Sequence, residues 1–394
     1  MSSLELESYH ESTDHLAGDE AEPRSRSQTL KFPANGCVWC VRVTFLGTIN
    51  HLSKDGRDAE KEISERHKEF ETFVKSINYH PLPLLDETVT EVVLKLSPER
   101  PRSIEVHSEA HDEYNLFIEH AKDFVCEIRE DPLRVTYPLR AEFPAFEAID
   151  VSSVEDKTVI AIGVYRVRLR HGGDQQLIYK TLDRLFYTEA DTSTIRKELE
   201  NLEYFRNAPH IAQTVGVVLS PNPNMTSPQD GEPLVINGIL LEFYRGGSLK
   251  QILSEDRLKK YDWQRWPCHI GAALSLLHDA KRTHMDVKLS NVVCDAKGDV
   301  FLIDISGIGG FTYAWLAPEM KCEAPDESFQ ACVLNDTWAY GKVLHEIASH
   351  AGCHPYATQV QDVAGKLTSE DPGSRMLLSA AIVQLRQSIP LLHV

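Results

Sequence analysis

The chain has too few basic residues to balance its acidic ones. It carries 41 lysines and arginines against 59 aspartates and glutamates, which gives a formal net charge of −18. Such a surface repels nucleic acid and anionic membrane, so we expect neither as a partner. Any anionic ligand must therefore be held by a local group of positive side chains.

Long apolar runs are also missing. No run approaches the roughly 20 residues that a membrane-spanning helix needs, and the N-terminus has no apolar segment flanked by positive charge. These absences predict an intracellular, cytoplasmic protein, with the nucleus as the alternative compartment. The composition, 42% apolar and 25% charged, is that of a globular chain, and 394 residues suggest two or three compact units.

Cysteines are few and scattered, which argues against a structural zinc site. Only Cys37 and Cys40 form a CxxC pair among the eight cysteines, and no second ligand pair follows at a compatible spacing. The surrounding CVWCVRVTF reads as a strand, where residues three apart point to opposite faces. We therefore expect Cys37 and Cys40 to be core residues rather than zinc ligands.

The composition changes along the chain and predicts three parts. Residues 1–30 are acidic and poor in apolar residues, which predicts a flexible tail. Residues 31–145 alternate strand and helix patterns and predict a small α/β module of unknown role. Residues 151–390 begin with short strands and continue with helices, which predicts a β-rich lobe joined to a helical lobe. We expect the segment 220–233, SPNPNMTSPQDGEP, to be an exposed loop between two strands.

Two amphipathic helices are predicted within the module at 31–145. The first lies near 57–78, and its apolar face consists of Ile63, Phe70, Phe73, Val74 and Ile77. The apolar face of the second consists of Tyr114, Phe117, Ile118, Ala121 and Val125. The run EVVLKL at 91–96 lies between the two helices and suits a strand.

Four residues in RTHMDVKLSNVVCDAKGDVFLIDISG, residues 282–307, suggest phosphoryl-transfer chemistry: Asp286, Lys288, Asn291 and Asp304. Transfer of a γ-phosphoryl group from ATP needs cations against the phosphate charge, oxygen ligands for Mg²⁺, and an acid beside the attacking hydroxyl. Asp304 follows the apolar strand VFLI and suits Mg²⁺, and Asn291 supplies an oxygen for a second metal ion. Lys288 can neutralise the transferred group, and Asp286 can accept or orient the substrate proton.

The stretch HMDVKLSN resembles the catalytic loop of protein kinases, and residues 151–390 resemble that fold as a whole. The resemblance implies an α+β, bilobal protein-kinase-like fold, with a β-rich N-lobe and a helical C-lobe, after the small α/β module. It also implies an ATP-dependent protein kinase of the Ser/Thr type, because Lys288 follows the loop aspartate by two residues. ATP and Mg²⁺ are the implied cofactors, and a protein is the implied substrate. The patterns VYRVRL, GILLE, THMD and LIDISGIGG are similar to kinase-domain proteins of filamentous fungi.

Other landmarks of the family follow in order. Lys180 in LIYK matches the lysine that contacts the α- and β-phosphates, and Glu198 in ELENL matches the glutamate that pairs with it. LLEFYRGGSL is similar to the hinge, so Leu241 would be the gatekeeper and the backbones of Glu242 and Tyr244 the adenine contacts. The remaining matches are Asp304 for the metal-binding aspartate, Ala317, Pro318 and Glu319 for the APE motif, Asp336 for the acid that anchors the catalytic loop, and Arg375 for the arginine that pairs with Glu319.

The chain departs from the family pattern at the Gly-rich loop. If Val164 is the valine after that loop, Lys157, Val159 and Ile162 occupy the three glycine positions, and Gly163 is the one small residue left. Side chains keep backbone amides away from phosphates, so this departure predicts weak nucleotide binding.

Three further departures bear on binding and regulation. Ile178 stands where the family usually has alanine beside adenine, which narrows the pocket. Met285 replaces the arginine that receives a phosphate from the activation segment, which predicts activity independent of that phosphate. The segment from Asp304 to Glu319 is short and offers a reduced platform for a peptide. The alternatives to an active Ser/Thr kinase are therefore a pseudokinase, a kinase-shaped binding or scaffold module, and, less favoured, a small-molecule kinase.

Overall fold

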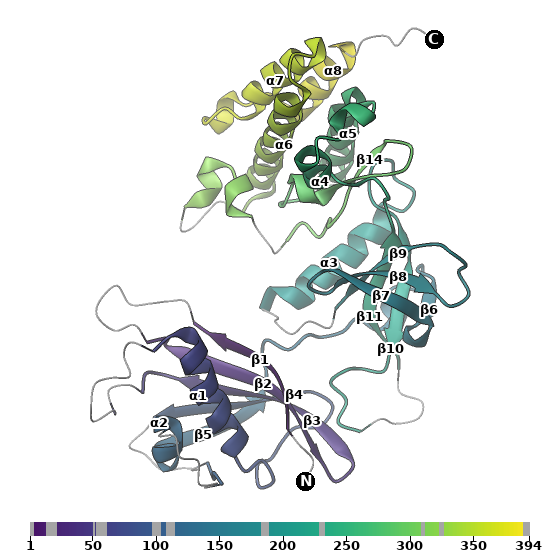
Figure 1. Ribbon diagram of the computed structural model, residues 1–394. Coiled ribbons are helices and arrows are strands. Elements are labelled where there is room, and N and C mark those ends of the chain that lie inside the picture. Colours follow the sequence, from purple (N-terminus) through teal and green to yellow (C-terminus); the bar gives the residue numbers. More distant parts are fainter. Residues whose placement is uncertain are drawn as a thin grey trace. The chain divides into compact units, whose positions relative to one another are not determined.

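The computed structural model describes residues 4–12, 22–49, 52, 61–96, 104–107, 115–182, 189–227, 233–308, 312–322 and 327–388. The chain folds into two compact units (Figure 1). The first comprises Met1–Thr136, Asp183–Glu189 and Pro221–Leu234, and the second comprises Tyr137–Leu182, Ala190–Ser220 and Val235–Val394. Among the described residues, no helix combines the length and the apolar character that a membrane span requires.

A five-stranded sheet in the order β1-β2-β3-β4-β5 forms the first unit (Figure 1). Neighbouring strands are antiparallel except β3 and β4, which are parallel because helix α1 connects them. The elements are β1 Glu5–Glu11, β2 Ser25–Ala34, β3 Cys37–Leu46, α1 Ile63–Ser76, β4 Val89–Leu96, α2 Leu116–Glu119 and β5 Phe124–Glu130. The strand expected at 91–96 is therefore confirmed as part of β4.

The core of the first unit lies between one face of this sheet and its two helices. Phe70 and Phe73 of α1 are fully buried and join a cluster with Phe45 of β3 and Phe117 of α2. The rings of Phe45 and Phe117 meet edge to face, with centroids 5.1 Å apart. Four of the five residues predicted for the inner face of α1 are buried, whereas Ile63 begins the helix and is 63% exposed.

The expectation of a flexible tail over residues 1–30 is wrong where the structure describes it. Strand β1 and the start of β2 both belong to the sheet. Strand β2 includes the buried Arg26, which donates to Glu22 at 2.9 Å and lies 5.3 Å from the ring centre of Phe117. Residues 1–3 and 13–21 lie outside the described part of the chain.

The second predicted helix is much shorter than expected. Helix α2 has only four residues, and a 3-10 turn at Ala121–Asp123 leads directly into β5. Val125 therefore lies in the sheet, where it pairs with Lys95 of β4. Tyr114 lies outside the described residues.

In its described part, the segment 220–233 is a loop between β10 and β11 as expected, with Pro221 and Pro233 exposed, but the expectation of exposure is wrong for Thr226. Thr226 is 3% exposed, and its carbonyl accepts a hydrogen bond from the Val38 amide of β3 at 2.9 Å. The Thr226 hydroxyl accepts from the amide of Glu87 at 3.0 Å. Turn residues thus pack as part of the first unit, because their polar groups are satisfied there. Residues 228–232 lie outside the described ranges.

Cys37 and Cys40 are half-buried, so the expectation of core cysteines is wrong. The Sγ of Cys37 is 3.2 Å from the hydroxyl of Ser227, and the Sγ of Cys40 is 3.8 Å from the carbonyl of Pro223. Both thiols therefore contact the 221–227 segment instead of the apolar cluster.

A six-stranded sheet in the order β6-β10-β11-β9-β8-β7 begins the second unit. Its strands are β6 Ala148–Asp150, β7 Val154–Ala161, β8 Val164–Leu169, β9 Leu177–Thr181, β10 Thr214–Ser220 and β11 Val235–Glu242, and helix α3 spans Glu189–Tyr204. Strand β9 pairs with both β8 and β11, which places Lys180 near the centre of the sheet.

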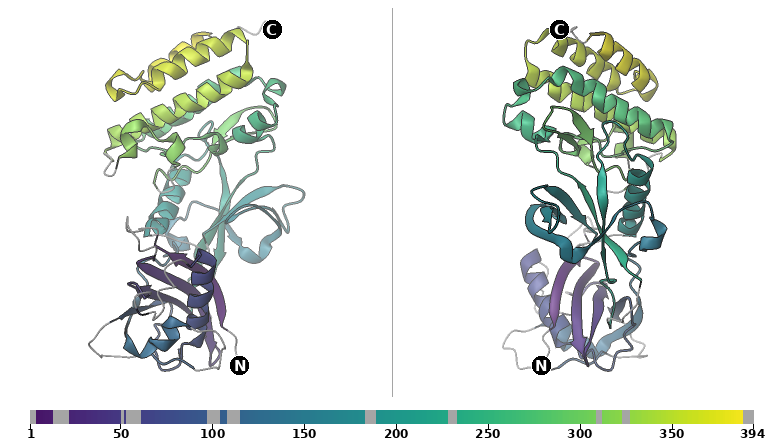
Figure 2. Two further views of the ribbon diagram at one scale, coloured as in Figure 1. Left: turned by 60° about the vertical axis from the view of Figure 1, so that its left-hand side comes forward. Right: turned by 90° about the vertical axis from the view of Figure 1, so that its right-hand side faces the viewer.

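Helices dominate the rest of the second unit (Figure 2). They are α4 Leu249–Ser254, α5 Trp266–Asp279, α6 Phe329–Ala351, α7 Pro355–Leu367 and α8 Leu378–Ser388, with a small sheet of β12 Gly247–Ser248, β13 Val292–Cys294 and β14 Val300–Leu302. A β-rich part followed by a helical part confirms the predicted α+β, bilobal fold.

Two histidines stack within the second unit and predict a pH-dependent stability. The rings of His210 and His269 have centroids 3.8 Å apart, with Asp299 and Arg265 also facing His269. Burial and then His210 lower the pKa of His269 to about 4. A histidine in the unfolded chain has a pKa of about 6.5, so the stability that comes from keeping His269 neutral is fully present above that pH. This contribution, about 2 kcal/mol after allowance for solvent screening, should be lost as the pH falls from 6.5 to 4.

Urea unfolding of wild type and His269→Gln at pH 7.5 and pH 5 checks this expectation. Wild type should lose more stability than the variant between the two pH values, while all other titrating groups are common to both. Equal losses would contradict the assignment.

Candidate active site

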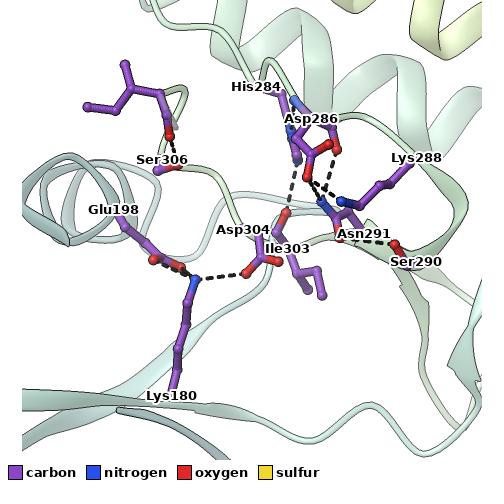
Figure 3. Close-up of polar contacts among 11 residues, drawn as sticks. Lys180, Glu198, His284, Asp286, Lys288, Ser290, Asn291, Ile303, Asp304 and Ser306 are labelled. Atoms are coloured by element: carbon purple, nitrogen blue, oxygen red, sulfur yellow. Dashed lines mark hydrogen bonds and ion pairs between the residues drawn. The ribbon is translucent and has the colours of Figure 1, made fainter. Parts of the chain in front are cut away.

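The side chains of Lys180, Glu198 and Asp304 meet, although they come from β9, α3 and the residues after β14 (Figure 3). The Lys180 Nζ lies 2.7 Å from both carboxylate oxygens of Glu198 and 2.9 Å from Oδ1 of Asp304. Burial disfavours the charge of Lys180, but the carboxylates of Asp304 and Glu198 outweigh it and raise the pKa. The lysine is therefore held in its charged form, and its predicted pairing with Glu198 is confirmed.

Asp304 combines an unusual backbone with a half-exposed carboxylate. Its φ of 58° lies in the left-handed region, which a residue other than glycine adopts only when its surroundings hold it there. Lys180 lowers the pKa of Asp304, although burial acts in the opposite direction. The side chain is 43% exposed, so an ionised carboxylate remains accessible.

The carboxylate of Asp286 is held by two other residues of its own loop (Figure 3). Lys288 Nζ donates to Oδ2 at 2.5 Å, and Asn291 Nδ2 donates to the same oxygen at 3.0 Å. Asn291 also donates to the Asp286 carbonyl at 2.9 Å. The side-chain nitrogen Nδ2 of Asn291 thus faces Asp286, and the side-chain oxygen Oδ1 of Asn291 points away from that carboxylate.

Asp336 supports this loop from below, as predicted. The side chain is completely buried and accepts hydrogen bonds from the amides of His284 at 2.8 Å and Met285 at 2.7 Å. These bonds hold Met285 at a φ of 64°, which methionine rarely adopts. His284 is buried and its Nε2 lies 2.9 Å from the carbonyl of Ile303, which ties the loop to the residue before Asp304.

Thr312 is a site residue that the sequence did not reveal. Its hydroxyl donates to Oδ1 of Asp286 at 2.8 Å. Lys288 donates to the same hydroxyl at 2.8 Å. The signal available in the sequence was the position of Thr312, five residues before Ala317, within a short activation segment that must pass close to the catalytic loop. Thr312 thus links the activation segment to the catalytic loop.

The rest of the activation segment is anchored by apolar and ionic contacts. Met285 is 4% exposed and joins a cluster with Leu316, Ala317 and Met320. Arg375 donates to both carboxylate oxygens of Glu319, at 2.5 and 2.7 Å, which confirms the predicted pair. Residues 309–311 lie outside the described part.

A cavity of about 780 Å³ adjoins these side chains. The predicted nucleotide-binding residues that line it are Ile178, Lys180, Leu241, Glu242, Tyr244, Asn291 and Asp304, and Lys288 lines it as well. Gly163 is not among its lining residues, whereas the adjacent Val164 is. Ile178 places a branched side chain in the wall of this cavity, at the position where the sequence predicted a narrower adenine pocket.

A tight hairpin replaces the Gly-rich loop. Strand β7 ends at Ala161 and β8 begins at Val164, so only Ile162 and Gly163 form the turn. Ile162 is 81% exposed and Val159 is 71% exposed. Lys157, at the first expected glycine position, is not among the residues that line the cavity. Its Nζ lies 5.0 Å from the ring centre of Tyr179, and neighbouring strand residues such as Tyr179 and Lys180 point to opposite faces.

The oxygen ligands at the cavity suit Mg²⁺, which needs few protein ligands, better than a metal ion that is coordinated entirely by protein side chains. Within the described ranges, no group of three or more His, Cys, Asp and Glu side chains could hold a metal ion. Asp304 and Asn291 supply two oxygen donors at the cavity. Magnesium usually takes one or two carboxylates and completes its shell with water and substrate phosphates. The residues present therefore fit a metal that arrives together with a nucleotide.

Comparisons with known proteins agree with this geometry. The family model described as "Protein kinase domain" matches residues 163–371, more than half of the chain. The ovarian-specific serine/threonine-protein kinase Lok of Drosophila melanogaster is 31% identical over 141 residues, which are 31% of this chain and 28% of the relative. The atypical protein kinase C of the same organism is 28% identical over 164 residues, 38% of this chain and 25% of the relative.

A plant relative gives the same result over a longer stretch. The LRR receptor-like serine/threonine-protein kinase RGI5 of Arabidopsis thaliana is 26% identical over 227 residues, 50% of this chain and 19% of the relative. The chain thus spans less than a third of the length of each of these three relatives. The family model, the shared stretches and the assembled site lead to one conclusion: the chain belongs to the protein kinase domain family.

Proposed function

We propose that the chain is an active Ser/Thr-type protein kinase, which transfers the γ-phosphoryl group of Mg²⁺·ATP to a hydroxyl of a protein. The observation that carries this proposal is the meeting of two groups at one cavity: Lys180 with Glu198 and Asp304, and Asp286 with Lys288 and Asn291. The names of the curated relatives and the position of Lys288 support the Ser/Thr type.

Each residue of the site has a distinct role in this proposal. Protein kinase domains in general use ATP and Mg²⁺, and the metal neutralises charge on the phosphates. Asp304 would hold one magnesium ion, Asn291 would supply an oxygen for a second, and Lys180 would hold the α- and β-phosphates. Asp286 accepts or orients the proton of the attacking hydroxyl, and Lys288, which already contacts Asp286, neutralises the transferring group.

Peptide libraries with a single acceptor type test the proposal. The purified chain is incubated with Mg²⁺ and γ-labelled ATP and with mixed-sequence peptides that contain only Ser, only Thr or only Tyr as acceptor. We expect label on the Ser or Thr peptides. Label on the Tyr peptides alone would overturn the Ser/Thr assignment.

A pseudokinase is the second candidate, and the β7–β8 hairpin is the observation that favours it. Apolar side chains occupy its tip, with Ile162 81% exposed, where the family has glycines close to phosphate. A pseudokinase would show an ATP-dependent rise in melting temperature without transfer of label. Transfer that Mg²⁺ removal abolishes would exclude it.

Activity should not depend on phosphorylation of the activation segment, because Met285 anchors that segment by apolar contacts. Phosphatase treatment of wild type should therefore leave turnover unchanged within about 2-fold. Met285→Arg would place an unpaired charge in this buried cluster and should lower the free energy of unfolding by about 2–4 kcal/mol. Met285→Leu, the volume-matched control, should cost less than about 1.5 kcal/mol. Loss of activity on phosphatase treatment would contradict the account.

A further inference from the structure

The site depends on keeping Glu198 and Asp304 in place. Glu198 belongs to helix α3, and Asp304 belongs to the segment after β14. Neither is part of the loop that carries Asp286, so other contacts must hold the three segments together. Asn201 lies three residues after Glu198 on α3, close to the same helix face, and is 3% exposed.

Asn201 connects α3 to the residues that follow Asp304. Its Nδ2 donates to the carbonyl of Ile305 and, at 3.4 Å, to the carbonyl of Ser306. Ile305 itself is 1% exposed, so this backbone is fixed in the interior directly beside the metal-binding aspartate. A shift of α3 would pull on the Asp304 segment through this amide.

Arg282 connects the same asparagine to the start of the catalytic loop. Its Nη1 donates to Oδ1 of Asn201 and to the carbonyl of Glu200 at 3.1 Å. Its guanidinium also lies 4.4 Å from the ring centre of Tyr204, in the last turn of α3. Arg282 precedes Asp286 by four residues, so the chain from one to the other is short.

We propose that Asn201 and Arg282 are positioning residues for phosphoryl transfer, which together hold α3, the Asp304 segment and the catalytic loop in the arrangement that catalysis requires. This inference rests on the proposed function. Both ends of the Asn201 amide are used, the nitrogen on the Asp304 segment and the oxygen on Arg282. A charge-assisted hydrogen bond to a buried amide is stronger than a neutral one, and loss of either partner leaves a buried polar group unsatisfied.

Arg206 supplies a matched control for Arg282. It lies just after the end of α3, donates to the carbonyl of Ala145, and has its guanidinium 5.5 Å from the ring centre of Phe146. It therefore makes the same two kinds of contact without touching the Asp304 segment or the catalytic loop. Arg206→Met removes these contacts as Arg282→Met removes those of Arg282.

Kinetics on Arg282→Met, Asn201→Leu, their double variant and Arg206→Met test the proposal. Arg282→Met and Asn201→Leu should each lower kcat by about 10- to 100-fold and raise the Mg²⁺ concentration for half-maximal turnover, because Asp304 is misplaced. The double variant should lose no more than the worse single variant, since both act through one connection. Arg206→Met should stay within about 2-fold of wild type. Additive losses, or an equal loss in the control, would overturn the proposal.

Hydrogen exchange of the full chain separates this inference from the proposed function. Amides of 304–308 and of α3 should exchange at least about 10-fold faster in Arg282→Met and Asn201→Leu than in wild type, and be unchanged in Arg206→Met. This readout needs no activity. If wild type transferred no phosphate, the proposed function would fail while exchange would still decide whether the connection exists. Unchanged exchange in Arg282→Met would refute it.

Discussion

An Asp286→Asn variant should bind Mg²⁺·ATP as tightly as wild type and turn over about 10²- to 10⁴-fold more slowly. Asparagine keeps the size of the side chain and can still accept from Lys288 and Asn291, which contact Asp286 in the structure. It loses the negative charge that accepts or orients the proton of the attacking hydroxyl. Calorimetry for binding and labelled phosphate transfer for turnover check the two halves of this expectation.

Asp262→Asn provides the control, because Asp262 is exposed and lies outside the cavity. It should match wild type in both binding and turnover. Normal turnover by Asp286→Asn would show that Asp286 is not the base. Loss of ATP binding by the same variant would instead show that its hydrogen bonds to Lys288 and Asn291 are needed to form the cavity.

An Asp304→Asn variant should lose Mg²⁺-dependent ATP binding, with a dissociation constant weaker by about 100-fold or more. The variant removes the half-exposed carboxylate that we assign to the metal. It also removes one of the two carboxylates that hold Lys180. Because Lys180 lowers the pKa of Asp304, wild type should retain Mg²⁺-dependent binding to a more acidic pH than an ordinary aspartate would allow.

Asp299→Asn, a change at the residue before β14, is the control for this variant. Asp299 faces His269 rather than the cavity, so its loss should leave ATP binding unchanged. Titrations with ATP at several Mg²⁺ concentrations distinguish the two variants. If Asp304→Asn bound ATP with the Mg²⁺ dependence of wild type, the metal would be held elsewhere.

Part of the site follows from local sequence, whereas Lys180 and Glu198 were assigned only through the resemblance to protein kinases. Asp286, Lys288 and Asn291 lie within six residues of one loop, so their spacing alone brings them together. Asp304 was found from the apolar strand before it, which is β14. Thr312 was missed because its contact with Asp286 spans 26 residues and requires the path of the activation segment.

The first unit was harder to predict because its strands depend on distant partners. The buried polar residues of β2 include Arg26, and its contacts with Glu22 and Phe117 do not show in the pattern of β2 itself. The segment that contains Thr226 has turn composition, which normally indicates exposure. Its docking depends on the amides of Val38 and Glu87, more than 130 residues earlier.

The central claim is that Lys180, Asp286, Asn291 and Asp304 form a working site for Mg²⁺-dependent phosphoryl transfer. The most direct test is transfer of labelled γ-phosphate from Mg²⁺·ATP by purified wild type and Asp304→Asn, each alone and with a generic protein substrate. We predict that wild type carries or transfers label and that the variant does not. No label from wild type, in a preparation shown to be folded, would contradict the claim.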